Sequence, residues 1–121
     1  MATTLDYNEV VQFMKDFKVD LINRYDDLII DQPTNTYVTI NNCKDIDDVK
    51  TRVVYALCRP IGKGLKDKDA TRLLNRVNEY FNTLLTKEDM RLLYEKLCYA
   101  SKLEEFKSFI QRGFPMNELT V

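Results

Sequence analysis

The chain contains no histidine and no tryptophan among its 121 residues. Histidine is the commonest general base in enzymes and a frequent zinc ligand, so its absence removes Ser-His and Cys-His nucleophiles and the usual zinc sites. Cys43, Cys58 and Cys98 fit no Cys-x-x-Cys spacing. We therefore expect no catalytic residue, no metal site and no cofactor.

Glycine and proline are also scarce, with three residues of each. A β-sandwich or barrel needs more turn residues, so this composition favours helices. The longest apolar run, Val53–Cys58, is too short to span a bilayer. The first residues lack the basic and apolar regions of a secretory signal. Together with the odd number of cysteines, these features predict a cytoplasmic protein with reduced thiols and no membrane partner.

Apolar residues recur at helical spacing in five segments: about 6–30, 46–59, 68–85, 87–100 and 102–112. Between the first two segments, residues 36–40 favour an extended backbone, as a loop or as an edge strand that another chain pairs. Pro60 is expected to close the second helix, which leaves residues 59–66 as a basic loop. The predicted fold is all-α: one domain, residues 1–121, built as a compact bundle of about five helices, with a flexible tail at 115–121.

Charge is sorted along the chain although the net charge is only −1. Residues 1–49 carry ten acids and four bases, and residues 50–76 carry eight bases and two acids. A protein with an acidic end and a basic middle presents fields of opposite sign to charged partners. The sequence thus predicts a function in binding and does not identify the partner.

The acidic candidate site follows from the helix expected over residues 6–30. At about 100° per residue, its carboxylates fall on a single stripe opposite the apolar face, with an aromatic ring at the edge. Such a stripe is most often a solvated face. As a functional surface, it would be an anionic ridge that docks on a basic protein and imitates phosphates. The predicted partner-binding residues are Glu9, Phe13, Asp16, Asp20, Asp27 and Asp31.

The basic candidate site covers the loop 59–66 and the start of the third helix. Its cations would bind phosphates of a nucleic acid, or would meet the acidic surface within the monomer or in a second copy. The neighbouring acids and the sequence pI of about 5.5 count against a nucleic-acid partner. The predicted residues are Arg59, Lys63, Lys66, Lys68, Arg72 and Arg76.

Two resemblances accompany these patterns. A short, glycine-poor chain rich in Asp, Asn, Lys and Tyr is similar to accessory proteins of phages and mobile elements, many of which inhibit host defence, anti-CRISPR proteins among them. Residues 74–80 with 87–93 resemble the helical hairpin of bacteriocin immunity proteins. Neither resemblance assigns a functional residue.

Three functions therefore remain open. The favoured one is a non-enzymatic inhibitor or adaptor of the phage type that docks on a larger protein through the acidic ridge, with a nucleic-acid-binding protein as one option for that partner. The second is a nucleic-acid-binding regulator that uses the basic site. The third is a structural, assembly or immunity-type protein, with the option of a homo-oligomer.

Overall fold

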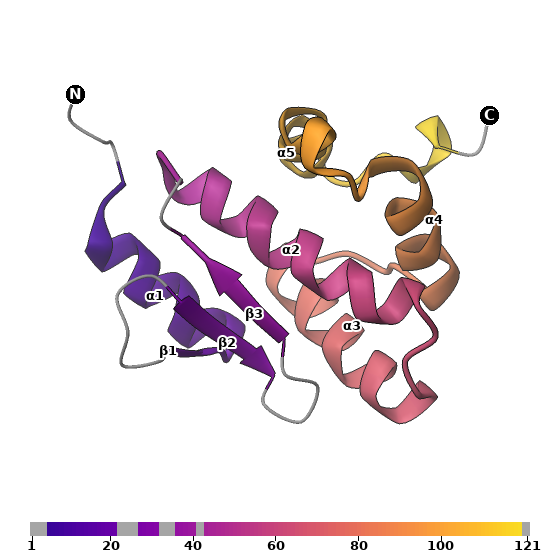
Figure 1. The fold of residues 1–121 in the computed structure, drawn as a ribbon, viewed down its shortest axis with the longest axis horizontal. Coiled ribbons are helices and arrows are strands. Elements are labelled where there is room, and N and C mark those ends of the chain that lie inside the picture. Colours follow the sequence, from indigo (N-terminus) through magenta and orange to yellow (C-terminus); the bar gives the residue numbers. More distant parts are fainter. Residues whose placement is uncertain (1–4, 22–26, 32–35, 41–42, 120–121) are drawn as a thin grey trace.

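The computed structural model describes residues 5–21, 27–31, 36–40 and 43–119. Over these residues the chain forms five α-helices, one of them central, together with three short strands (Figure 1). The predicted compact bundle of five helices with an extended segment near residues 36–40 is confirmed. The helices are α1 (Tyr7–Phe17), α2 (Ile46–Gly62), α3 (Asp67–Phe81), α4 (Lys87–Leu97) and α5 (Leu103–Gln111).

A small antiparallel sheet accompanies the helices and was not predicted. Its strands are β1 (Asp20–Leu21), β2 (Asp27–Asp31) and β3 (Thr36–Thr39), in the order β1-β2-β3. Leu28 of β2 lies opposite both Leu21 and Val38. The extended segment therefore pairs within its own chain. The helix predicted over residues 6–30 ends at Phe17, and residues 20–21 and 27–30 are strands, while residues 22–26 lie outside the described residues.

The end of α1 explains this difference. Lys18 adopts a left-handed conformation with φ of 61°. The Lys18 N–H donates to the Lys15 carbonyl at 3.3 Å, and the Val19 N–H donates to the Met14 carbonyl at 2.9 Å. These two bonds make a Schellman motif, in which Val19 packs back near Met14. Since this motif normally carries glycine, a lysine gives no warning in the sequence that the helix stops.

Lys18→Gly is expected to raise the free energy of unfolding by about 1 kcal/mol, because glycine adopts a positive φ without the strain of a Cβ. The ion pair lost with Lys18 is weak, since it joins exposed side chains of Lys18 and Glu79 at 3.8 Å. Lys15→Gly, three residues earlier in α1, is the matched control and should lower the same free energy by about 1 kcal/mol. Urea unfolding of both variants measures whether the free energy of unfolding rises or falls. A lower free energy of unfolding for Lys18→Gly would contradict the motif.

Helix α2 is the central element, with α1 and the sheet on one side and α3, α4 and α5 around the rest (Figure 1). It begins after Asp45, whose carboxylate caps the helix by accepting the Asp48 N–H at 2.9 Å. It does not end at Pro60, which lies inside the last turn, and so residues 59–62 are helical instead of a loop. At Gly62 an added Cβ would clash with Tyr94, so glycine lets α4 lie close to the end of α2.

The core is a cluster of buried apolar side chains from β3 and all five helices. An aromatic group joins α1 to α3: the Phe17 ring lies 5.3 Å from Phe13 and 5.6 Å from Tyr80, centroid to centroid. Burial of this group helps to attach α1 to α3, because large aromatic rings contribute strongly to core stability.

The C-terminal segment includes residues 115–119 of the predicted flexible tail, whose flexibility stays a prediction. Gly113 ends α5 with φ of 85°, and the Phe114 ring packs 6.0 Å from Phe109, as the spacing of these residues indicates. A 3-10 turn, η3 (Met116–Glu118), follows, and its Glu118 carboxylate binds Arg112 at 2.7 Å. Residues 120–121 of the predicted tail lie outside the described residues.

Candidate functional site

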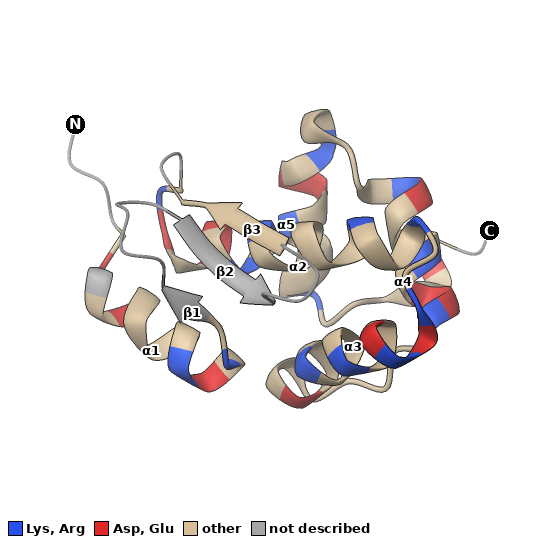
Figure 2. Cartoon of the chain, turned by 60° about the horizontal axis from the view of Figure 1, so that its bottom comes forward, with Lys and Arg blue, Asp and Glu red and all other residues tan. Residues whose placement is uncertain are grey.

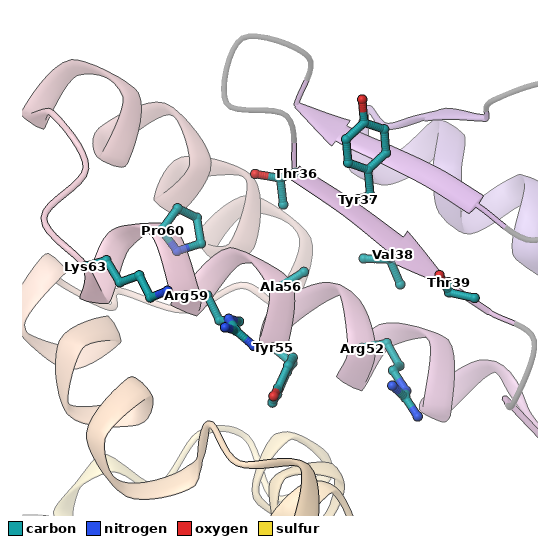
Figure 3. Close-up of a pocket in the computed structure, with 10 residues that line it drawn as sticks. All are labelled: Thr36, Tyr37, Val38, Thr39, Arg52, Tyr55, Ala56, Arg59, Pro60 and Lys63. Atoms are coloured by element: carbon teal, nitrogen blue, oxygen red, sulfur yellow. The ribbon is translucent and has the colours of Figure 1, made fainter.

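A groove of about 500 Å³ lies between β3 and α2 (Figure 3). This volume falls in the range of ligand-binding sites in proteins. The groove is open to solvent along its length, and one wall comes from each element. The lining residues are Thr36, Tyr37, Val38 and Thr39 of β3 and Arg52, Tyr55, Ala56, Arg59, Pro60 and Lys63 at or just beyond α2.

The helical wall is a row of cations on one face of α2. Arg52, Arg59 and Lys63 are separated by seven and four residues, which places them on the same side of a helix. Their side chains are drawn in Figure 3, where the Lys63 chain runs toward Arg59. None of the ten lining residues is acidic. The charged residues on the walls of the groove are therefore all cations, although Arg52 also lines a small adjoining cavity with Asp48 and Glu104.

The strand wall alternates between buried and exposed side chains. Thr36 and Val38 are buried, whereas Tyr37 and Thr39 are exposed. The Tyr37 side chain keeps 52% of its surface accessible, which is unusual for a large aromatic residue. With Tyr55 on the helical wall, the groove offers two phenol groups next to its cations.

Pro60 lies in the wall of the groove, where it lacks one main-chain hydrogen-bond donor of α2. Proline has no N–H, so it cannot donate the helical hydrogen bond to the carbonyl of Ala56. Both residues line the groove. The helix nevertheless continues past Pro60, because the Lys63 N–H bonds to the Arg59 carbonyl at 3.0 Å. This continuation places Lys63 in line with Arg59, which a loop at 59–66 would not do.

The sorting of charge seen in the sequence is mostly lost on the folded surface, where blue and red segments intermingle along α1, α3 and α4 (Figure 2). Several cations form ion pairs with nearby carboxylates. The ion pairs are Arg72–Asp69 at 3.0 Å, Arg91–Glu88 at 2.9 Å, Lys107–Asp48 at 2.9 Å, and Lys87–Asp67 at 2.5 Å. The groove differs from these helices in that no acidic residue is among those that line it.

The Lys107 pair ties α5 to the first turn of α2. The amine of Lys107 lies 2.9 Å from Asp48 and 3.3 Å from Asp45, between side-chain atoms. Burial of Asp48 opposes ionisation, but the Lys44 N–H and Lys107 outweigh it and hold the pKa of Asp48 below its usual value. This pairing fixes the start of the helix that carries the cation row.

The anionic ridge predicted on a single helix is wrong in its geometry. Asp20 lies in β1, and Asp27 and Asp31 lie in β2, because α1 ends at Phe17. Phe13 is 2% exposed and packs inside the aromatic group, so it cannot serve as an exposed anchor. Two of the six residues, Glu9 and Asp16, remain exposed on α1. A role for these two carboxylates in partner binding stays a prediction.

The predicted basic site is divided by the fold. Arg59 and Lys63 line the groove, whereas Lys66, Lys68, Arg72 and Arg76 do not. Lys66 precedes α3 and the other three lie on it. The prediction therefore found two of the three groove cations and missed Arg52. A helical reading of residues 46–63 would have found Arg52, because it lies one heptad before Arg59.

The three cysteines are free and buried. Burial raises the pKa of the Cys43 thiol to about 11 and holds the pKa values of Cys58 and Cys98 above the usual range. These thiols are protonated at neutral pH, and a protonated thiol is a poor nucleophile. Within the described part of the chain, no group of three or more Cys, Asp or Glu residues is placed to hold a metal ion.

Comparison of the chain with family models, curated proteins and solved structures finds no match. No helix in the described ranges has both the length and the apolar character needed to cross a membrane.

Proposed function

We propose that this protein acts by binding, without catalysis, and that its groove between β3 and α2 holds an acidic segment of a larger protein. One observation carries the proposal: Arg52, Arg59 and Lys63 share one face of α2, and no carboxylate lines the groove they face. A cation row of this kind selects a chain that carries several negative charges. The exposed Tyr37 adds an amphipathic contact surface.

The proposed partner is a protein, as the sequence predicts, but the charges on the two sides of the contact are exchanged. The partner presents the acidic residues, and this chain presents the basic ones. As an inhibitor or adaptor, it would cover an acidic segment that its partner needs for another contact. The resemblance to phage and mobile-element accessory proteins supports such a role, and the three free cysteines support a cytoplasmic setting.

A single-stranded nucleic acid is the second candidate for the groove. Two tyrosines beside three cations are the residue types on which bases stack and phosphates bind. The narrow footprint disfavours this candidate, because the four other predicted cations lie outside the groove. The sequence pI of about 5.5 is also far below that of typical nucleic-acid-binding domains.

The test is a fluorescence-anisotropy titration with a labelled eight-residue peptide in which glutamate alternates with valine. Arg59→Ala is expected to weaken binding about fivefold, the effect of losing one exposed charge contact of about 1 kcal/mol. Arg91→Ala is the matched control, since Arg91 is an exposed helical arginine outside the groove. Absence of peptide binding, or equal losses in the two variants, would contradict the proposal.

An eight-nucleotide oligothymidylate, titrated in the same way, tests the second candidate. A groove that binds three phosphates would give an affinity that falls with the logarithm of salt at a slope of about −2. If the oligonucleotide binds more tightly than the peptide and Arg59→Ala weakens it, the groove is a nucleic-acid site and the protein-partner proposal is wrong.

A further inference from the structure

We propose that Cys58 and Cys98 form a redox-active pair, which hydrogen peroxide oxidises to a disulfide that links α2 to the end of α4. This proposal goes beyond the proposed function and does not depend on the groove. It rests on where the two packed helices place the thiols. Cys43 precedes α2 and lies outside this helix pair, so the chain supplies its own control cysteine.

One side of α2 packs against α4 (Figure 1). Tyr55, Cys58 and Gly62 are separated by three and four residues, the spacing that puts residues on one face of a helix. At one end of this face, the Cys98 thiol donates to the Tyr55 carbonyl, with the sulfur 3.7 Å from the oxygen. At the other end, Gly62 lies against Tyr94 of α4. Cys58 lies between these two contacts and therefore faces the last turn of α4.

The two thiols approach the same turn of α2. The Cα–Cβ bond of a helical residue tilts toward the start of the helix, so its side chain covers the preceding turn. The Cys58 side chain thus lies over the turn that contains Tyr55, whose carbonyl binds the Cys98 thiol. Electrostatics agree with this placement: burial raises the pKa of the Cys58 thiol, and nearby Cys98 raises it further. The two sulfur atoms are therefore neighbours across the interface of α2 and α4.

The two thiols differ in their access to solvent. Cys58 is 0% exposed, whereas Cys98 is 9% exposed and follows α4 in a non-helical conformation. Burial raises the pKa of the Cys98 thiol, but the charge of Arg59 acts in the other direction and favours the thiolate. Hydrogen peroxide is small and reaches the less buried thiol first. Cys98 is thus the thiol that meets the oxidant, and Cys58 is the thiol that completes the disulfide.

The oxidation takes two steps. In the first, the Cys98 thiolate attacks one oxygen of hydrogen peroxide, the O–O bond breaks, and a sulfenic acid and hydroxide form. The hydroxide takes up the proton that the Cys98 thiol released. In the second step, the Cys58 sulfur attacks the Cys98 sulfur, the S–O bond breaks, and the oxygen leaves as water with the Cys58 proton. Two thiols are oxidised to one disulfide, and hydrogen peroxide is reduced to two molecules of water.

The test treats the folded native protein with hydrogen peroxide at about pH 8.5, where more of each thiol is ionised. Free thiols are then alkylated, and trypsin places the three cysteines in separate peptides, 25–44, 53–63 and 97–102. We expect mass spectrometry to find peptide 53–63 joined to 97–102, about tenfold or more above any joined peptide that contains Cys43. Oxidation in urea should lose this preference, because the unfolded chain holds no pair of thiols in a fixed geometry.

Three variants separate the roles of the cysteines. Cys43→Ser is the matched control and should form the same disulfide as the native protein. Cys58→Ala should stop at the sulfenic acid of Cys98, which dimedone traps as a stable adduct. Cys98→Ser should leave Cys58 as a free thiol. Circular dichroism checks that each variant folds, and the measurement on the native protein stands whether or not a variant does.

A second readout is stability. The disulfide joins residues that are far apart in the sequence, so it should raise the urea midpoint of unfolding, and dithiothreitol should reverse the rise. Absence of the joined peptide after oxidation of the folded protein would overturn the proposal. The same mixture of joined peptides in folded and urea-treated protein would overturn it as well. Neither result affects the peptide titration that tests the proposed function.

Discussion

A protein carrying Arg52→Glu, Arg59→Glu and Lys63→Glu is expected to bind the alternating glutamate and valine peptide about 100-fold more weakly than the native chain. Each substitution replaces an attraction by a repulsion, and three exposed contacts of roughly 1 kcal/mol each give about 3 kcal/mol, which corresponds to that factor. All three side chains are at the surface or half-buried. The folded state should therefore tolerate the change, and circular dichroism checks that it does.

The matched control reverses three cations elsewhere, with Arg91→Glu, Lys96→Glu and Lys102→Glu. The total change in charge is the same, but none of these residues lines the groove. We expect the control to bind within about threefold of the native protein at 0.15 M salt, where fields from distant exposed charges are largely screened. If the control loses as much affinity as the groove variant, then net charge governs binding and the groove is not the site.

Phe17→Ala is expected to lower the free energy of unfolding by about 3–5 kcal/mol, a large part of the 5–15 kcal/mol that holds a typical domain together. The Phe17 side chain is 1% exposed and contacts the rings of Phe13 and Tyr80. Truncation leaves a cavity where α1 meets α3, and the surrounding rings cannot fill it without leaving their rotamers. Urea unfolding followed by circular dichroism measures the loss.

Leu84→Ala supplies the comparison for this loss. Leu84 follows α3 and is 96% exposed, so its truncation removes little buried surface and should change the free energy of unfolding by less than about 0.5 kcal/mol. A loss below about 1 kcal/mol for Phe17→Ala would show that α1 is not packed on α3 as described. A large loss for Leu84→Ala would show that a partner surface or second copy covers that leucine.

The helical part of the fold could be predicted because local signals agree with tertiary packing. Thr86 caps α4 as its spacing from Asp89 indicates, with both bonds of a capping box present. Gly113 and Phe114 follow α5 with positive φ angles, and glycine adopts such an angle without strain. Thr86 has a side-chain oxygen that accepts the Asp89 N–H, and Gly113 has the backbone freedom that a positive φ requires.

The sheet could not be predicted, because no local residue marks the end of α1. Lys18 holds a position that favours glycine, and the apolar spacing continues at helical period through Leu28. Strands β1 and β2 gain their stability from pairing with each other and with β3, which periodicity along one segment does not record. The predicted acidic ridge failed with the helix that carried it.

The sequence predicts only part of the groove, again because the end of a helix is misplaced. Arg59 and Lys63 were recognised as cations of one cluster, but Pro60 was expected to end the helix between them. Proline in the last turn loses one hydrogen bond and is compatible with continued helical backbone when later bonds form. With α2 continuing to Gly62, Arg52 joins the cluster and β3 becomes its second wall.

The intermingled ion pairs on α3, α4 and α5 bear on how a partner arrives. For the proposed acidic partner, a groove lined by cations on a surface of mixed charge favours approach from one side. The groove would therefore influence the orientation and the rate of encounter before any contact forms.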